Sequence, residues 1–332
     1  MAAPVTPDDE PGGDSVLPTT PSDPPVPSRH GGCRAGHRPS VATTLVSPAL
    51  RAERAAPDPA VLRLLDGLSR DAFVADLETL AAHHTRRSDS SGFDEAATWA
   101  ETVLADAGYS VTTQPVPRGG GRCRNVIADR PGAAAEPHEV VLVTAHLDSI
   151  NLAGPAEPAP GADDNGSGSA GLLELARALA DHPAALDLRL ILFGGEEEGL
   201  FGSETYVAEL PAADRARIRA VLNMDMIGGR NTAEAGVLLE GAEVSQDVID
   251  ALARAAATYT DLMVTTSLHP FNSDHVPFID AGIPAVLTIE ADDSANTRPH
   301  TAADTVAGVD PDLAIAILRM NVAYLVEALG SA

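Results

Sequence analysis

From residue 60 onward, apolar runs of strand length alternate with segments of helical periodicity. This alternation is the strongest constraint on the fold, because near-continuous apolar strands separated by helices are typical of a largely parallel sheet covered on both faces. The expected strands span residues 139–145, 188–193, 220–224 and 284–289. The expected helices that alternate with them span residues 169–180, 246–258 and 312–329. We therefore predict an α/β fold, a single three-layer αβα domain with a mixed, mostly parallel, twisted sheet.

Two amphipathic helical segments precede the first expected strand. They span residues 60–83 and 95–107, and Gly108 stands where a left-handed residue commonly ends a helix. Residues 1–59 differ from the rest, because they contain 12 of the 26 prolines and 5 of the 28 glycines without a repeat period. Such a composition is typical of disorder. We expect a disordered N-terminal segment at 1–59 and a folded domain at 60–332.

The charge balance and the length of the apolar runs exclude several classes of partner. The chain carries 48 acidic and 22 basic residues, a net charge of −26, which argues against a nucleic-acid partner. No apolar run approaches the roughly 20 residues that a helix needs to cross a bilayer, so no membrane partner is expected. Residues 1–30 lack the pattern of a signal peptide, so the default location is cytoplasmic. Cys33 and Cys123 are expected to be free thiols without a catalytic role.

Carboxylates and histidines gather directly after the expected strands. In open α/β sheets, ligands bind beyond the carboxyl ends of the strands, and five segments present metal-type side chains there. These residues are His146 and Asp148; Asp163, Asp164 and Asn165; Glu196, Glu197 and Glu198; Asp225; and His300. Converging carboxylates raise each other's pKa unless a cation compensates their charge. Two histidines with several carboxylates and no cysteine suit zinc, with manganese or cobalt as weaker alternatives.

Each of these features also has a structural explanation when it is taken alone. A single histidine at a strand end is more often a hydrogen-bonded structural residue, residues 163–165 can cap the helix that follows, and the three glutamates can be solvated surface charge. Gly166, Gly168 and Gly171 fit a dinucleotide-binding pattern, but that pattern requires its glycines directly at a strand-to-helix turn. The sequence contains no nucleophile elbow, phosphate loop or H-E-x-x-H helix. The concentration of ligand-type residues at one edge favours a metal site.

Six sequence motifs follow one another between residues 146 and 305. They are HLDS at 146–149, GADDNGSG at 161–168, GGEEEGLFGS at 194–203, NMDMIG at 223–228, SDHVPF at 273–278 and HTAADT at 300–305. Their order resembles the co-catalytic dizinc aminopeptidases of the bacterial leucyl aminopeptidase type, within the aminopeptidase Y metallopeptidase family. Glutamate carboxypeptidase II and glutaminyl cyclase are members of the wider family. The resemblance implies a zinc metallopeptidase domain with a phosphorylase/hydrolase-like fold at residues 60–332.

The resemblance also implies a set of metal ligands. Asp164 would bridge two zinc ions, His146 and Asp225 would complete one site, and Glu197 and His300 would complete the other. This assignment agrees with the chemistry of such centres, because two metal ions about 3.5 to 4 Å apart need a carboxylate that both can share.

Two further residues receive catalytic roles, Glu196 from the resemblance and Asp148 from its position two residues after His146. Glu196 would be the general base, and Asp148 would accept the free ring N–H of His146 and orient that imidazole. The family pattern implies a cis peptide bond between Asp164 and Asn165. Together these roles imply a zinc-dependent aminopeptidase, in which a metal-bound hydroxide attacks the first carbonyl of a peptide or protein N-terminus. We expect a monomer.

The sequence departs from the family pattern beside the last histidine. Many relatives carry a tyrosine there, but this chain has Pro299, and no tyrosine lies between Tyr259 and Tyr324. The group that stabilises the oxyanion is therefore left open. Asp274 and His275 are interpreted as a network at the start of a helix rather than as site residues.

Three alternatives to an aminopeptidase stay open at this point. Arg298 and Arg230 could bind a substrate carboxylate, which would favour a carboxypeptidase. A glutaminyl-cyclase-like enzyme would use a single catalytic zinc, so the number of bound ions separates it from the aminopeptidase. A binding domain without activity is the third, although such relatives usually lose ligands and none is lost here.

Overall fold

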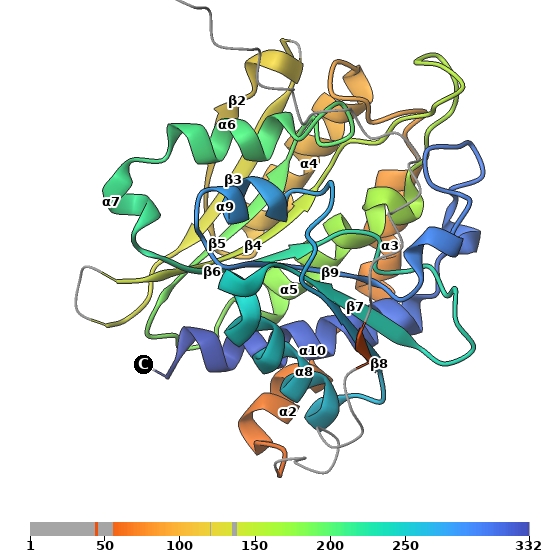
Figure 1. Ribbon diagram of the computed structural model, residues 1–332. Coiled ribbons are helices and arrows are strands. Elements are labelled where there is room, and N and C mark those ends of the chain that lie inside the picture. The colour runs from red at the N-terminus through yellow and green to blue at the C-terminus, as the bar shows by residue number, and fades with distance from the viewer. Residues whose placement is uncertain (1–43, 46–55, 120, 135–137, 332) are drawn as a thin grey trace, which may run out of the picture. The chain divides into compact units, whose positions relative to one another are not determined.

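The centre of the sheet consists of the four strands expected from the sequence. The computed structural model describes residues 44–45, 56–119, 121–134 and 138–331. In it, β5 (Asp187–Phe193), β4 (Val140–His146), β6 (Ile218–Met224) and β9 (Ala285–Glu290) lie in that order and run parallel (Figure 1). Their bounds lie within two residues of those expected. The parallel core of the sheet is therefore confirmed.

Antiparallel strands at both flanks make the sheet mixed. On one side β3 (Arg124–Arg130) pairs antiparallel with β5, and β2 (Ser110–Pro115) pairs antiparallel with β3. On the other side β7 (Gly236–Glu240) runs antiparallel to β9, β8 (Met263–Ser267) runs parallel to β7, and β1 (Thr44–Leu45) runs antiparallel to β8. The order is β1-β8-β7-β9-β6-β4-β5-β3-β2. None of the five flanking strands is among those expected, and only the pair of β7 and β8 among them is parallel, so the sheet is mixed at its flanks.

The segment expected to be disordered, residues 1–59, lies mostly outside the described residues, as does Cys33. Its described parts are Thr44–Leu45, which form β1, and residues 56–59. Pro59 is already the first residue of the helix α2.

The single helix expected at 60–83 is instead two helices, α2 (Pro59–Asp66) and α3 (Arg70–Ala81). Gly67 closes the first, because its N–H donates back into the last turn of α2. Ser69 starts the second, because its side chain accepts a hydrogen bond from the N–H of Ala72. The apolar periodicity continues through this break, so the pattern alone does not reveal it.

The other helices lie close to their expected positions where the sequence predicted them. α4 (Ser91–Asp106) begins four residues before the expected start, because the side chain of Ser90 caps it. Gly108 has the expected positive φ of 89°. The remaining helices are α5 (Gly168–Leu179), α6 (Phe201–Glu209), α7 (Ala212–Arg215), α8 (Gln246–Tyr259), α9 (His275–Asp280) and α10 (Pro311–Leu329). In the described part of the chain, no helix has the length and apolar character needed to span a membrane.

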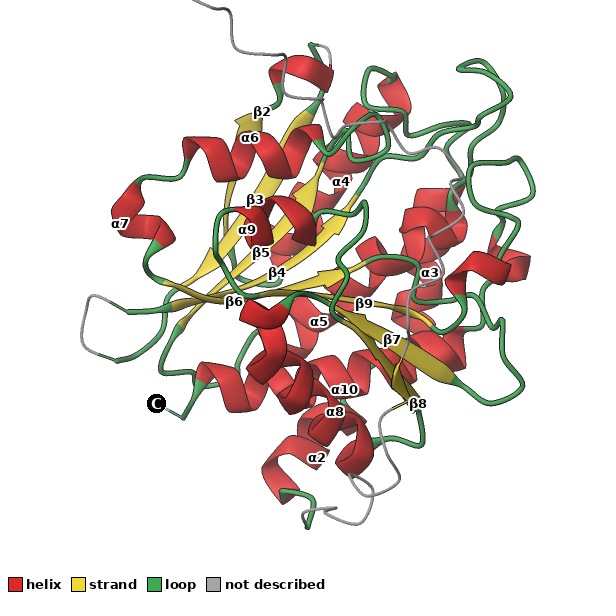
Figure 2. Ribbon diagram, in the orientation of Figure 1, coloured by secondary structure: helices red, strands yellow, loops and turns green. Residues whose placement is uncertain are grey.

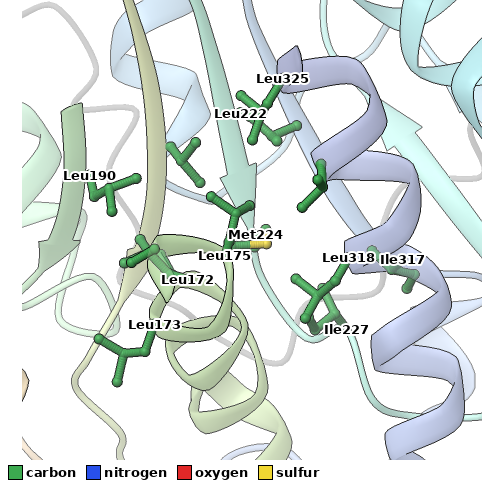
Figure 3. Packing of buried hydrophobic residues seen from close by; sticks show 14 of the residues in the cluster. Leu172, Leu173, Leu175, Leu190, Leu222, Met224, Ile227, Ile317, Leu318 and Leu325 are labelled. Atoms are coloured by element: carbon green, nitrogen blue, oxygen red, sulfur yellow. The ribbon is translucent and has the colours of Figure 1, made fainter. Parts of the chain in front are cut away.

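Helices cover both faces of the sheet, which confirms the three-layer architecture (Figure 2). Neighbouring residues of one strand point to opposite faces. In β4, Val141 and Val143 pack in the larger core with α5 and α10, whereas Leu142 packs in the smaller core with α6 and α9. The larger core includes Leu172 of α5, Leu222 of β6 and Leu318 of α10 (Figure 3). Burial on both faces explains why the central strands read as continuous apolar runs.

We expect Cys123 to resist alkylation in the folded protein. Its side chain is buried, and burial together with the nearby carboxylates of Asp148 and Glu198 raises the pKa of the thiol far above its ordinary value. The reactive thiolate is therefore almost absent at neutral pH. Mass spectrometry after iodoacetamide treatment should find Cys123 unmodified in native protein and fully modified in urea. Rapid modification in native protein would show that this burial is wrong.

Candidate metal centre

The residues predicted as metal ligands meet at one edge of the sheet. His146 is the last residue of β4, Asp225 directly follows β6, and Glu197 lies in the turn after β5. His300 belongs to the long loop after β9, and Asp164 belongs to the turn Ala162–Ser167 that leads into α5. Because β4, β5, β6 and β9 are parallel, their carboxyl ends lie at the same edge of the sheet, where open α/β sheets bind their ligands.

Asp164 stands between two sets of donor atoms. Its Oδ1 lies 3.3 Å from Nε2 of His146, and its Oδ2 lies 3.0 Å from Nε2 of His300. The Nε2 atom of His146 is also 3.3 Å from Oδ1 of Asp225, and that of His300 is 2.7 Å from Oε2 of Glu197. Each oxygen of Asp164 thus faces a different imidazole, and each imidazole faces one further carboxylate.

These donor atoms have the chemistry and the spacing that zinc requires. Ligand atoms about 2.0 to 2.2 Å from a tetrahedral zinc ion stand about 3.3 to 3.6 Å from one another. The two separations at His146, both 3.3 Å, match that spacing, and the two at His300, 3.0 and 2.7 Å, are shorter than it. In addition, neither buried oxygen of Glu197 receives a hydrogen bond of acceptable geometry from the described residues, although His300 lies close to one of them. A cation would satisfy both oxygens.

The electrostatics of the cluster also point to cations. Burial, helped by the carboxylate of Asp164, raises the pKa of Glu197 to about 8, and burial raises the pKa of Glu196 well above its ordinary value. Burial acts to lower the pKa of His300, but Glu197 and Asp164 outweigh it and raise that pKa to about 12. The positive charge of two imidazolium rings cannot balance four buried carboxylates. Bound cations would supply the missing positive charge in place of the protons that the raised pKa values favour.

The carboxylate of Asp148 holds the turn that carries the glutamates. Its Oδ1 accepts the N–H of Glu196 at 3.1 Å, and its Oδ2 accepts the N–H of Glu197 at 3.1 Å. The predicted bond to the ring of His146 needs correction: Nδ1 lies 3.2 Å from the main-chain oxygen of Asp148 but 3.7 Å from its Oδ1. The nearer acceptor for the ring N–H is therefore the carbonyl. The predicted cis peptide bond between Asp164 and Asn165 is confirmed.

Residues 125–325, more than half of the chain, match the model of peptidase family M28. The chain belongs to this family. Leupeptin-inactivating enzyme 1 of Streptomyces exfoliatus is 36% identical over 220 residues, which are 64% of this chain and 47% of that enzyme. Leucine aminopeptidase 1 of Coccidioides posadasii is 32% identical over 286 residues, which are 80% of this chain and 72% of that protein.

A solved M28-like structure agrees with the fold as well. BSAP, a zinc aminopeptidase from Bacillus subtilis, superposes with a TM-score of 0.55 at 29% identity, covering 62% of this chain and 50% of that one. The chain therefore spans about half the length of BSAP and of the Streptomyces enzyme. The family resemblance that the motifs predicted is confirmed.

One chain of hydrogen bonds in this M28 site escaped the sequence analysis. The hydroxyl of Ser273 donates to Oδ2 of Asp225 at 2.7 Å, and Nδ2 of Asn223 donates to that hydroxyl at 2.9 Å. Thr144 in turn donates to Oδ1 of Asn223 at 2.7 Å. Polar residues inside the apolar runs of β4 and β6 were the available signal, because a buried polar side chain needs a partner.

Asp274 and His275 lie at the start of α9, as expected, and both are buried. The carboxylate of Asp274 makes no capping hydrogen bond to α9, so the predicted network at the helix start does not include a side-chain cap by Asp274. Nε2 of His275 lies 3.6 Å from Oε1 of Glu240.

No tyrosine hydroxyl replaces the one expected before the last histidine of an M28 enzyme. All four tyrosines lie in the described residues, and the hydroxyls of three bond elsewhere: Tyr109 to the carbonyl of Ala176, Tyr206 to Arg189, and Tyr259 to the N–H of Asp58. Tyr324 is buried in the core with α10. The described tyrosines therefore provide no hydroxyl in place of the one that the family pattern has before the last histidine.

Proposed function

We propose that this M28 protein is a zinc-dependent aminopeptidase that hydrolyses the first peptide bond of peptides and protein N-termini. The observation that carries the proposal is the position of Asp164, whose two oxygens face two separate sets of nitrogen and oxygen donors. The similarity to a zinc aminopeptidase and to a leucine aminopeptidase supports it.

We assign the ligands from this geometry. His146 and Asp225 would hold one zinc ion, Glu197 and His300 would hold the other, and Asp164 would contact both. Zinc bound there supplies Lewis-acid polarisation of the peptide carbonyl and lowers the pKa of water. Stabilisation of the oxyanion would depend more on zinc here, because none of the described tyrosines offers its hydroxyl to that oxygen.

Glu196 is the proposed general base. It is buried beside the ligands, with its Oε2 atom 4.0 Å from Nε2 of His146. Its raised pKa suits a group that first accepts a proton and then releases it. Glu196 would take a proton from the attacking water as the bond between oxygen and the carbonyl carbon forms. It would then pass that proton to the leaving amine nitrogen as the carbon–nitrogen bond breaks.

The arginines that could favour a carboxypeptidase are engaged elsewhere. In Arg298, Nε donates to Oδ1 of Asn296 and Nη1 donates to the carbonyl of Gly308. Arg230 pairs with Asp310 at 3.2 Å. The chain contains no lysine. Because these two arginines are already paired, a substrate ammonium group is favoured over a substrate carboxylate.

A substrate comparison tests this function. We expect the zinc-loaded protein to hydrolyse aminoacyl p-nitroanilides and dipeptides, and to leave their N-acetylated forms intact. Failure on every free aminoacyl anilide and dipeptide, beside an active relative as the positive control, would refute the aminopeptidase. Cyclisation of an N-terminal glutaminyl peptide with one zinc per chain would instead support the cyclase alternative.

A further inference from the structure

A buried arginine holds the carbonyl side of the turn that carries Asp164. Arg86 has no solvent exposure, and its Nη1 and Nη2 atoms donate to the carbonyls of Pro160 at 2.6 Å and Gly161 at 2.9 Å. Its Nε donates to the carbonyl of Leu147 at 2.8 Å, next to His146 in the chain. Nη1 also reaches the carbonyl of Leu80 at the end of α3. Each of these hydrogen bonds of the guanidinium goes to a main-chain oxygen.

A buried aspartate holds the amide side of the same turn. Oδ1 of Asp304 accepts the N–H of Asp163 at 2.9 Å, and Oδ2 accepts the N–H of Asp164 at 3.0 Å. The main-chain oxygen of Asp304 accepts the N–H of Ala162 at 3.2 Å. Three consecutive amides are thus bound by one residue. Asp304 belongs to the same loop as His300, so it ties the segment of one proposed ligand to that of another.

The two side chains act on opposite faces of one short segment. Residues 160 and 161 present their carbonyls to the guanidinium, whereas residues 162–164 present their amides to Asp304. Charge-assisted hydrogen bonds of this kind are stronger and more directional than neutral ones. The planar guanidinium also has a fixed fork of donors, which a lysine ammonium group cannot reproduce. The segment is therefore held in position from both sides.

We propose that Arg86 and Asp304 are a positioning pair that sets the place of Asp164 relative to His146 and His300. The inference rests on the proposed function, because it takes these three residues as zinc ligands. A ligand that two ions share must be placed accurately for both, and functional constellations tolerate errors of only about 0.5 Å. Groups that support metal ligands typically change metal affinity by about 10- to 100-fold when they are altered.

The test compares Arg86→Lys and Asp304→Asn with two matched controls at the other end of the sheet. Arg130 also donates to three main-chain carbonyls, those of Leu179, Ala180 and His182, and Asp187 also accepts a main-chain N–H, that of Gly132. Zinc affinity is measured by chelator competition on the metal-free full chain, with circular dichroism to confirm folding. The visible absorption of bound cobalt reports the coordination geometry.

We expect Arg86→Lys and Asp304→Asn each to bind zinc about 10- to 100-fold more weakly than wild type and to alter the cobalt spectrum. Arg130→Lys and Asp187→Asn should stay within about threefold of wild type, whatever they cost in stability. The double variant Arg86→Lys, Asp304→Asn should lose less than the product of the two single effects, because both act on one segment.

The outcomes separate this proposal from the proposed function. Wild-type affinity and spectrum in folded Arg86→Lys would overturn the positioning pair even if Asp304→Asn does not fold. Equal losses in the controls would also overturn it, since the effect would then follow from stability alone. A wild type that binds no zinc would overturn the proposed function and the pair together. A wild type that binds zinc but cleaves no peptide would overturn only the aminopeptidase, and the affinities would still decide the pair.

Discussion

Replacing Glu196 with glutamine is expected to lower kcat by a factor of about 10² to 10⁴ while the zinc content stays at the wild-type level. Glutamine keeps the shape of the side chain but accepts no proton at neutral pH. Glu196 is buried beside His146, with its Oε2 atom 4.0 Å from Nε2 of that residue, and the proposed ligand set does not include it. Steady-state kinetics on an aminoacyl anilide, with metal analysis of the same sample, gives both quantities.

Glu198→Gln is the matched control for this variant. Glu198 stands two residues further along the same turn, but its carboxylate pairs with Arg87 and bonds to Ser88 instead of facing the ligands. We expect its kcat to stay within a few-fold of wild type. Full activity in Glu196→Gln, or an equal loss in Glu198→Gln, would remove the assignment of Glu196 as general base.

Replacing Asp164 with alanine is expected to have the second large effect, the loss of both zinc ions and with them of activity. Both donor sets lose an oxygen at once, because the two oxygens of Asp164 face His146 and His300 separately. Lewis-acid catalysis contributes several kcal/mol to such hydrolysis, so kcat/KM should fall by at least about 10³-fold. Metal analysis after dialysis against metal-free buffer, followed by kinetics, measures the two losses.

Asp129→Ala provides the comparison for Asp164→Ala. Asp129 is also an aspartate of the sheet region, but it pairs with Arg189 far from the strand ends that carry the ligands. We expect this variant to keep the zinc content of wild type. Retention of zinc and activity in Asp164→Ala would mean that Asp164 is not the shared ligand.

The sequence predicted the four central strands but missed β7, although all five residues of that strand are buried as well. β4, β5, β6 and β9 are covered on both faces, so each appears as a continuous apolar run. By contrast, β2 is mostly exposed and β8 mostly half-exposed, both contain two threonines, and nothing local distinguishes them from loops. Their strand geometry depends on pairing partners that are distant in the sequence.

In the candidate site, too, some residues could be predicted from the sequence and others could not. Residues at the ends of predicted strands, such as His146 and Asp225, could be predicted because the topology of a parallel sheet brings strand ends together. Arg86 and Asp304 could not, since the residues of the turn that they bind, 160–164, lie 74 to 142 positions away in the sequence. Such contacts depend on how loops meet in space, and neither residue type nor spacing encodes them.

The most direct test of the two-metal centre is anomalous diffraction at the zinc edge from crystals of the zinc-loaded protein. The account predicts two peaks about 3.5 to 4 Å apart, with Asp164 between them. One should lie beside His146 and Asp225, and the other beside Glu197 and His300. A single peak, or peaks away from Asp164, would contradict the central claim.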